Sequence, residues 1–149
     1  MDPASLRVPR GLTFSRLLSI TSKSPYAVKA LCELALCGAS VPIPIGELAR
    51  RRDIPQQFLE GLFATLRRAG ILRSQRGVKG GYLFARSPSE VTVLEVVELL
   101  EGELGAGEGA DDEIWAEAVG ALRDVLAKTT IAQLAEGEAQ ARGQAMYYI

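Results

Sequence analysis

The apolar residues after Ser24-Pro25 recur at the three- and four-residue spacing of a helix with one buried face. Serine is a favoured N-cap residue and proline suits the first helical position, so this pair predicts where the helix begins. The helix is expected to end near Gly38. Its apolar positions are Ala27, Val28, Leu31, Leu34 and Ala35.

Two shorter helices are predicted to follow. Segment 41–45 contains two prolines, which favours a short extended connection over a central strand. A brief helix is then expected over 47–52, and another after Asp53-Ile54-Pro55, ending at Gly70. The last helix carries one apolar stripe, made of Phe58, Leu59, Leu62, Phe63 and Leu66.

A small β-hairpin comes next, because 71–74 and 82–85 are short strand-like segments around a glycine-rich connection. The connection carries Arg76 and Lys79. Three short helices followed by such a hairpin are the order of elements in a winged helix-turn-helix domain, which binds DNA.

Beyond Pro88 the pattern predicts a short helix over 91–100 and a longer one from Asp111 to about Lys128. A single helix in so small a domain cannot bury a broad apolar stripe on both sides. We therefore expect pairing with a second copy, with packing inside one chain as the alternative. The large residues of the stripe are Ile114, Trp115, Val119, Leu122, Val125 and Leu126.

The expected fold is mainly α with a small β-hairpin wing: a winged helix-turn-helix domain plus a long C-terminal dimerisation helix. We divide the chain into four parts. They are a flexible basic arm over 1–18, the winged domain over 19–88, a helical connection and dimerisation region over 89–136, and a C-terminal tail over 137–149.

The net charge of −1 hides a strong asymmetry between the two parts of the chain. Residues 1–86 hold 14 Lys and Arg against 5 Asp and Glu, a net charge of +9. Residues 87–149 hold 3 against 13, a net charge of −10. Either the first part binds a polyanion, or the basic and acidic parts simply attract each other.

Several function classes are disfavoured. The chain has no histidine and only two cysteines, Cys32 and Cys37, which excludes Ser-His-Asp triads, Cys-His dyads and histidine-ligated zinc, so we do not expect an enzyme. The two thiols lie about 140° apart around one helix and cannot bond to each other. They are expected to be small buried hydrophobes, with a redox-sensing thiol as the alternative. No apolar run suits a membrane span or a secretory signal, so we expect a cytoplasmic protein.

The third helix carries side chains that can hydrogen-bond to base edges. Gln57 and Glu60 lie three residues apart on one face, with Gln56 beside them. The alternative is an ordinary solvated polar face. Basic residues around this helix are candidates for phosphate contacts: Arg50, Arg51, Arg52, Arg67, Arg68 and Arg73. Arg76, at the tip of the hairpin, suits a narrow minor groove.

Four motifs in order resemble the Rrf family of bacterial transcriptional regulators: ITSKSPYAVKAL at 20–31, FLEGLF at 58–63, LRRAGIL at 66–72 and RGVKGGYLFAR at 76–86. The resemblance implies a homodimer on double-stranded DNA with two winged helices. It also implies phosphate contacts from Thr21, Ser22 and Lys23, base contacts around Gln57 and Glu60, and insertion of Arg76 into the minor groove.

Many members of that family hold an iron-sulphur cluster on three cysteines in the loop after the helix that follows the wing. Here that loop, 101–114, contains no cysteine, so we expect no cluster and no other cofactor. The acidic residues of this glycine-rich loop are interpreted as a solvated surface rather than a metal site.

The C-terminus ends in Tyr147, Tyr148 and Ile149. This ending resembles that of family members that regulate cysteine metabolism and partner with cysteine synthase, an enzyme that accepts C-terminal isoleucines of its partners. A terminal carboxylate beside an apolar side chain suits such docking. The alternative is that these residues pack against the protein's own dimerisation helix.

Overall fold

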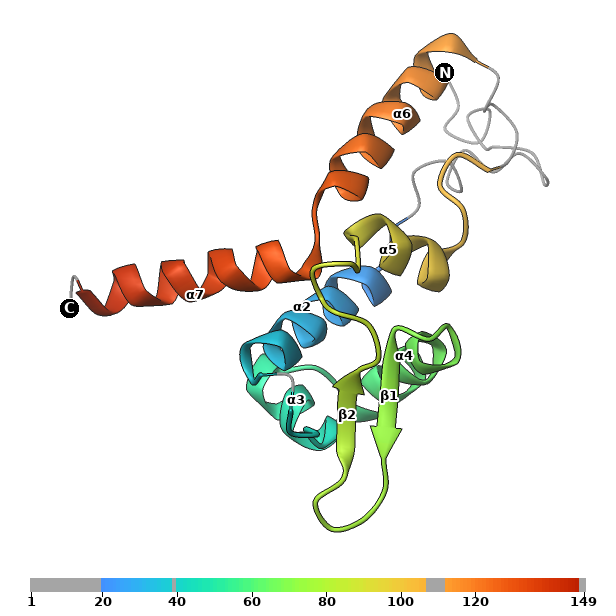
Figure 1. Cartoon of the computed structure of the whole chain (residues 1–149). Helices are drawn as coiled ribbons and strands as arrows, with labels where there is room; N and C mark the ends of the chain where they lie inside the picture. Colours follow the sequence, from blue (N-terminus) through green and yellow to red (C-terminus); the bar gives the residue numbers. More distant parts are fainter. Residues whose placement is uncertain (1–19, 39, 107–111, 148–149) are drawn as a thin grey trace, which may run out of the picture.

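The computed structural model describes residues 20–38, 40–106 and 112–147, and it is mostly helical (Figure 1). A two-stranded antiparallel sheet lies in the middle of the chain. The elements are α2 (Lys23–Leu36), α3 (Ile45–Arg52), α4 (Gln56–Arg68), β1 (Leu72–Gln75), β2 (Gly81–Phe84), α5 (Val93–Glu101), α6 (Glu113–Lys128) and α7 (Ile131–Tyr147). The helices α6 and α7 project from the winged unit in different directions (Figure 1).

The core is built around α2, which packs against α3, α4, α5 and α7. Small and branched residues line its buried face, which lets four helices approach it closely. The partners contribute Leu48, Leu59, Phe63, Leu66, Val96 and Ile131, each of them fully buried. The Phe63 ring meets the edge of Tyr82 on β2 at 5.1 Å between centroids, so the core continues under the hairpin.

The hairpin is attached to the segment that precedes α3. Ile43 and Tyr82 exchange two backbone hydrogen bonds, with N···O distances of 3.0 and 2.8 Å. Gly81 makes this approach possible. Its φ is +152°, and a Cβ at this position would lie 2.3 Å from the carbonyl of Ile43. The wing is therefore anchored to the helix-turn-helix rather than only hinged to α4.

A second, smaller cluster joins α5 to α6. Val93, Val97 and Leu104 are buried there, and Leu122 and Leu126 of α6 pack against them. The two ends of this region are pinned together by the backbone. Val93 donates to the carbonyl of Thr129 at 2.8 Å, and Ile131 donates to that of Val91 at 2.9 Å. The end of α6 is therefore held beside the start of α5.

A buried carboxylate, Glu33 of α2, connects three helices. It accepts hydrogen bonds from Arg52 at 2.8 Å and Arg51 at 3.3 Å, both on α3, and from Arg142 of α7 at 3.4 Å. Arg52 in turn donates to Glu138 of α7, with an N···O distance of 2.5 Å. The arrangement pairs each buried charge with an opposite one, as burial requires.

The sequence-based expectation for the fold is confirmed: a mainly α chain with a hairpin wing. Some boundaries differ. Ser22, not Ser24, is the N-cap of α2, since Pro25 then falls in the first turn, where its missing N–H is not needed. The buried Ser24 hydroxyl has no hydrogen-bond partner among the described residues. α3 begins at Ile45, earlier than expected, because Pro44 supplies an extended N-cap.

The C-terminal boundary that we drew between residues 136 and 137 falls inside a helix. α7 runs unbroken from Ile131 to Tyr147, so the segment interpreted as a tail is helical through residue 147. Ile131 and Ala135 bury its first turns, and Glu138 fixes the next turn through Arg52. The predicted arm over 1–18 lies outside the described residues.

We predict that Glu33→Gln destabilises the fold and weakens its dependence on acid pH. Burial alone would raise the pKa of Glu33, but the hydrogen bonds and charge of Arg52, with those from Arg51 and Arg142, outweigh it and hold the pKa below its ordinary 4.5. The carboxylate therefore stabilises the native state fully above about pH 4.5, and this contribution is lost as the pH falls through the lowered pKa.

Urea unfolding from pH 3 to pH 7 tests this. Glu33→Gln should lower the unfolding free energy by about 2 kcal/mol at pH 7 and by less at pH 3. The exposed Glu136→Gln on α7 serves as the control. Equal destabilisation by Glu33→Gln at both ends of the pH range would contradict the assigned pairing.

Candidate nucleic-acid interface

The helix α4 buries its apolar side and exposes a polar one. Leu59, Leu62, Phe63 and Leu66 face the core, while Gln57 and Glu60 are exposed as the pattern predicted. Gln56 behaves differently from its neighbours. Its amide nitrogen donates to Glu60 Oε1 at 3.2 Å, so it holds the carboxylate in place. Glu60 keeps a second oxygen with which to accept from a base.

Gly46 of α3 leaves room for this arrangement. A Cβ at that position would lie 3.1 Å from Gln56 Oε1, tighter than an ordinary contact. The two helices of the helix-turn-helix therefore meet at Gln56, and Asp53 makes the turn between them in a left-handed conformation with φ of 54°. The position of Glu60 is fixed by the motif rather than by α4 alone.

The wing presents an exposed basic tip, residues 76–79, between β1 and β2. Arg76 and Lys79 are both exposed, and neither takes part in the ion pairs of the described residues. The turn is closed by the amide of Gly80, which donates to Gly77 at 3.0 Å. Val78 stands fully in solvent at 105% relative exposure. The sequence analysis did not single out Val78 as a candidate contact residue, because it considered only the charged residues of the connection.

The arginines around α4 fall into two groups. Arg67, Arg68 and Arg73 are exposed and available to phosphates. Arg51 and Arg52, which were also candidates for phosphate contacts, are engaged in ion pairs within the chain. The side chain of Arg52 is only 13% exposed and is taken up by Glu33 and Glu138. Arg51 is held by Glu47 at 2.6 Å and by Glu33.

The start of α2 brings together the three residues that the resemblance assigned to phosphate binding. Ser22 and Lys23 are exposed. Thr21 is already engaged within the chain, because its amide and hydroxyl both donate to the carboxylate of Glu101 on α5. A phosphate at Thr21 would have to replace Glu101, whereas Ser22 and Lys23 need no rearrangement.

One part of the apolar stripe of α6 packs inside the chain, and the other part faces solvent. Val119 is buried, and Leu122 and Leu126 pack against the α5 cluster, so this half follows the intramolecular alternative. Ile114 and Val125 remain 64% and 62% exposed, and Trp115 is 38% exposed. Only this second half is available for a second copy of the chain.

The two thiols lie in different surroundings. Cys32 is buried, and its burial, followed by the nearby Glu138, raises its pKa to about 11. Cys37 is half-buried, and its sulphur accepts a hydrogen bond from Arg51 at 3.0 Å. In residues 20–38, 40–106 and 112–147, no three acidic, cysteine or histidine side chains lie together as a metal site would need.

Two parts of the predicted sites lie beyond what the structure describes. Tyr147 is the last residue of α7, and Tyr148 and Ile149 lie outside the described residues, as do residues 107–111 of the acidic loop. Within the described part of the chain, no helix is long and apolar enough to cross a membrane.

Comparison with known proteins places this geometry in a family. Residues 20–137 match the Rrf2 family model, described as an iron-dependent transcriptional regulator. The putative HTH-type transcriptional regulator slr0846 of Synechocystis is 42% identical over 87 residues, which cover 58% of this chain and 59% of that protein. The HTH-type transcriptional regulator CymR of Bacillus subtilis is 30% identical over 141 residues, 89% of this chain and all of CymR.

Solved structures agree with the sequence comparison. The structure of the B. subtilis CymR, titled the global cysteine regulator, superposes with a TM-score of 0.74 over 80% of this chain and 97% of its own, at 30% identity. IscR of T. potens superposes with a TM-score of 0.73 over 83% of this chain and 90% of its own, at 31% identity. The winged helix-turn-helix with its additional helices is therefore the shared architecture.

An exposed polar face on α4, a basic wing tied to the same unit, and matches along most of the chain lead to one assignment: this chain belongs to the Rrf2 family of winged-helix, DNA-binding transcription regulators.

Proposed function

We propose that the chain is a repressor that binds a palindromic operator as a homodimer, with α4 in the major groove and the wing in the minor groove. The observation that carries the proposal is the fixed relation between α4 and the wing. The Ile43–Tyr82 backbone pair anchors the wing to the same unit that presents Gln57 and Glu60. A bound dimer represses by covering the promoter.

Specificity and affinity are assigned to different residues. Glu60, held by Gln56, accepts from the amino group of a cytosine, and Gln57 contacts a neighbouring base. Lys23, Arg67 and Lys79 neutralise phosphates, and Ser22 donates a hydrogen bond to one. These contacts set the register without reading the sequence. Arg76 enters the minor groove, where a narrow A·T-rich segment concentrates negative potential.

We predict that the two classes of residue respond differently to sequence and salt. Glu60→Ala should relax the preference at one base position by about 1 to 3 kcal/mol and leave the salt dependence unchanged. Arg76→Ala should weaken A·T-rich sites most and lower the slope of log K against log salt by about 1. Fluorescence anisotropy on duplexes with single base changes, from 50 to 300 mM salt, measures both.

Lys128→Ala is the matched control, because Lys128 is also an exposed basic residue but lies in the last turn of α6, outside the residues assigned to DNA. A salt-independent affinity for duplex DNA, or uniform weakening by Glu60→Ala and Arg76→Ala alike, would contradict the proposed roles.

Dimer formation is proposed through the exposed half of the α6 stripe. Ile114 and Val125 leave large apolar surfaces in solvent on a helix that projects from the body (Figure 1). Pairing of two such helices buries these surfaces and produces two-fold symmetry. That symmetry is the reason why the operator is proposed to be palindromic.

We predict that Val125→Glu converts the dimer to a folded monomer, since it places a carboxylate in the proposed apolar contact. Analytical ultracentrifugation gives the mass, and circular dichroism verifies the fold. Val41→Glu is the control, because Val41 is 58% exposed and lies far from α6 in the sequence. A wild-type monomer, or a Val125→Glu dimer of unchanged stability, would contradict this interface.

We also propose that this member works without an iron-sulphur cluster, although the matching family is described as iron-dependent. The available ligands do not suit such a cluster. The sequence holds no histidine and two cysteines, of which Cys32 is buried and Cys37 bonds to Arg51. A thiolate-ligated cluster needs more thiolates than these, and needs them together.

A second, compatible function is docking to cysteine synthase through the C-terminus. It is favoured by the match to the whole of CymR, whose structure is titled the global cysteine regulator. The helix α7 carries the chain away from the body and ends at Tyr147, two residues before the terminal Ile149 (Figure 1). A terminal carboxylate beside an apolar side chain suits capture by a partner.

We predict that deletion of Ile149 abolishes binding to cysteine synthase and leaves operator binding unchanged. The deletion removes the isoleucine side chain and transfers the terminal carboxylate to Tyr148. Surface plasmon resonance with immobilised synthase measures the first, and anisotropy with duplex DNA the second. Synthase binding that persists after the deletion would contradict docking.

A further inference from the structure

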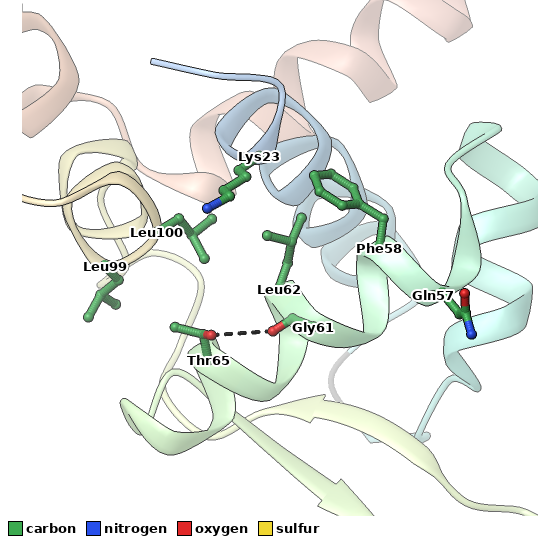
Figure 2. A pocket seen from close by; sticks show the side chains of 8 residues that line it. All are labelled: Lys23, Gln57, Phe58, Gly61, Leu62, Thr65, Leu99 and Leu100. Carbon is green, nitrogen blue, oxygen red and sulfur yellow. Dashed lines mark hydrogen bonds between the residues drawn. The ribbon is translucent and has the colours of Figure 1, made fainter. Parts of the chain in front are cut away.

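A hollow of about 330 Å³ lies between the start of α2, the middle of α4 and the end of α5 (Figure 2). Its volume is at the lower end of the range for small-molecule sites in proteins. Its apolar surface comes from Leu62, Leu99 and Leu100, while Lys23 and Thr65 add polar groups at its edge. Gln57 lines its margin, but the Gln57 amide points away from it (Figure 2).

Lys23 gives the hollow a positive charge that no ion pair among the described residues neutralises. The side chain of Lys23 extends over the leucines, and its ammonium takes no part in the ion pairs of the described residues (Figure 2). The carboxylate of Glu101 is turned to the amide and hydroxyl of Thr21 instead. An ammonium beside an apolar surface suits an anionic group carried on an apolar body.

Gly61 keeps the α4 side of the hollow open. Glycine in the middle of a helix costs about 1 kcal/mol relative to alanine. The protein's own packing does not require it here, because a Cβ at position 61 would meet no atom within 4 Å. Position 61 therefore leaves free space on the α4 side of the hollow.

We propose that this hollow binds a small organic anion, a carboxylate on a short apolar body, and that its occupancy lowers the affinity for DNA. The second part rests on the proposed function, since Lys23 and α4 belong to the interface assigned to DNA. A DNA phosphodiester could also pair with Lys23, but it has no apolar group to bury against Leu62, Leu99 and Leu100. The apolar surface therefore favours the amphiphilic anion.

Titration of the isotope-labelled full-length protein with hexanoate, without DNA, tests the site by NMR. Saturable shifts are expected at the amides of Lys23, Gly61 and Leu100, and neutral 1-hexanol should bind more weakly. Lys23→Gln should weaken hexanoate about fivefold and leave 1-hexanol unchanged. Lys29→Gln, also on α2 and exposed but outside the hollow, should have no effect.

Filling the hollow provides a second, independent variant. Gly61→Met should abolish hexanoate binding, because its side chain occupies the free space. Gly143→Met is the matched control, since a Cβ there also meets no atom within 4 Å but lies on α7. Hexanoate binding that survives Gly61→Met would overturn the assignment, as would shifts that do not saturate.

The effect on DNA is measured separately. Saturating hexanoate should raise the Kd for an operator duplex at constant ionic strength, with sodium chloride replacing hexanoate in the reference. If hexanoate binds and no duplex does, the proposed DNA function fails while the site stands. If a duplex shifts the amide signals of Lys23 and Gly61 and hexanoate does not, the hollow contacts the DNA backbone and this proposal is wrong.

Discussion

A buried carboxylate between α2, α3 and α7 constrains how these helices can be arranged. Glu33 sits on the most buried helix, α2, where an unpaired charge would cost several kcal/mol. Arg52 and Arg51 satisfy it from α3, and Arg142 from α7. Because Arg52 also binds Glu138, the first helix of the helix-turn-helix and the C-terminal helix are held in one register. The outward face of α4 is positioned on this framework.

The winged unit could be predicted from the sequence because its signals are local. Helical periodicity, prolines near the helix starts and the glycine-rich connection predicted the order of elements and placed their boundaries within about two residues. The exposed face of α4 followed from the same periodicity, so Gln57 and Glu60 were recognised before the fold was known. The binding of Gln56 to Glu60 depends on a choice of rotamer, which periodicity does not determine.

What the sequence could not predict depends on partners far away along the chain. Arg52 is one of three consecutive arginines, and only the fold brings it to Glu138, 86 residues later. The split of the α6 stripe depends on where α5 and Leu104 lie. No separate helix was predicted after Lys128, because the glycines and polar residues of α7 give it little amphipathic pattern and its stability comes from packing on α2.

The pinning of Val93 to Thr129 and of Ile131 to Val91 makes α6 and its acidic loop a closed excursion from the body. A chain segment whose two ends are tied at one place can gain or lose residues without moving what precedes or follows it. The number of residues between Gly105, which follows the packed Leu104, and the start of α6 is thus decoupled from the spacing between the winged unit and α7. Residues can be added to or removed from this stretch while Gln57, Glu60 and the wing keep their relative positions.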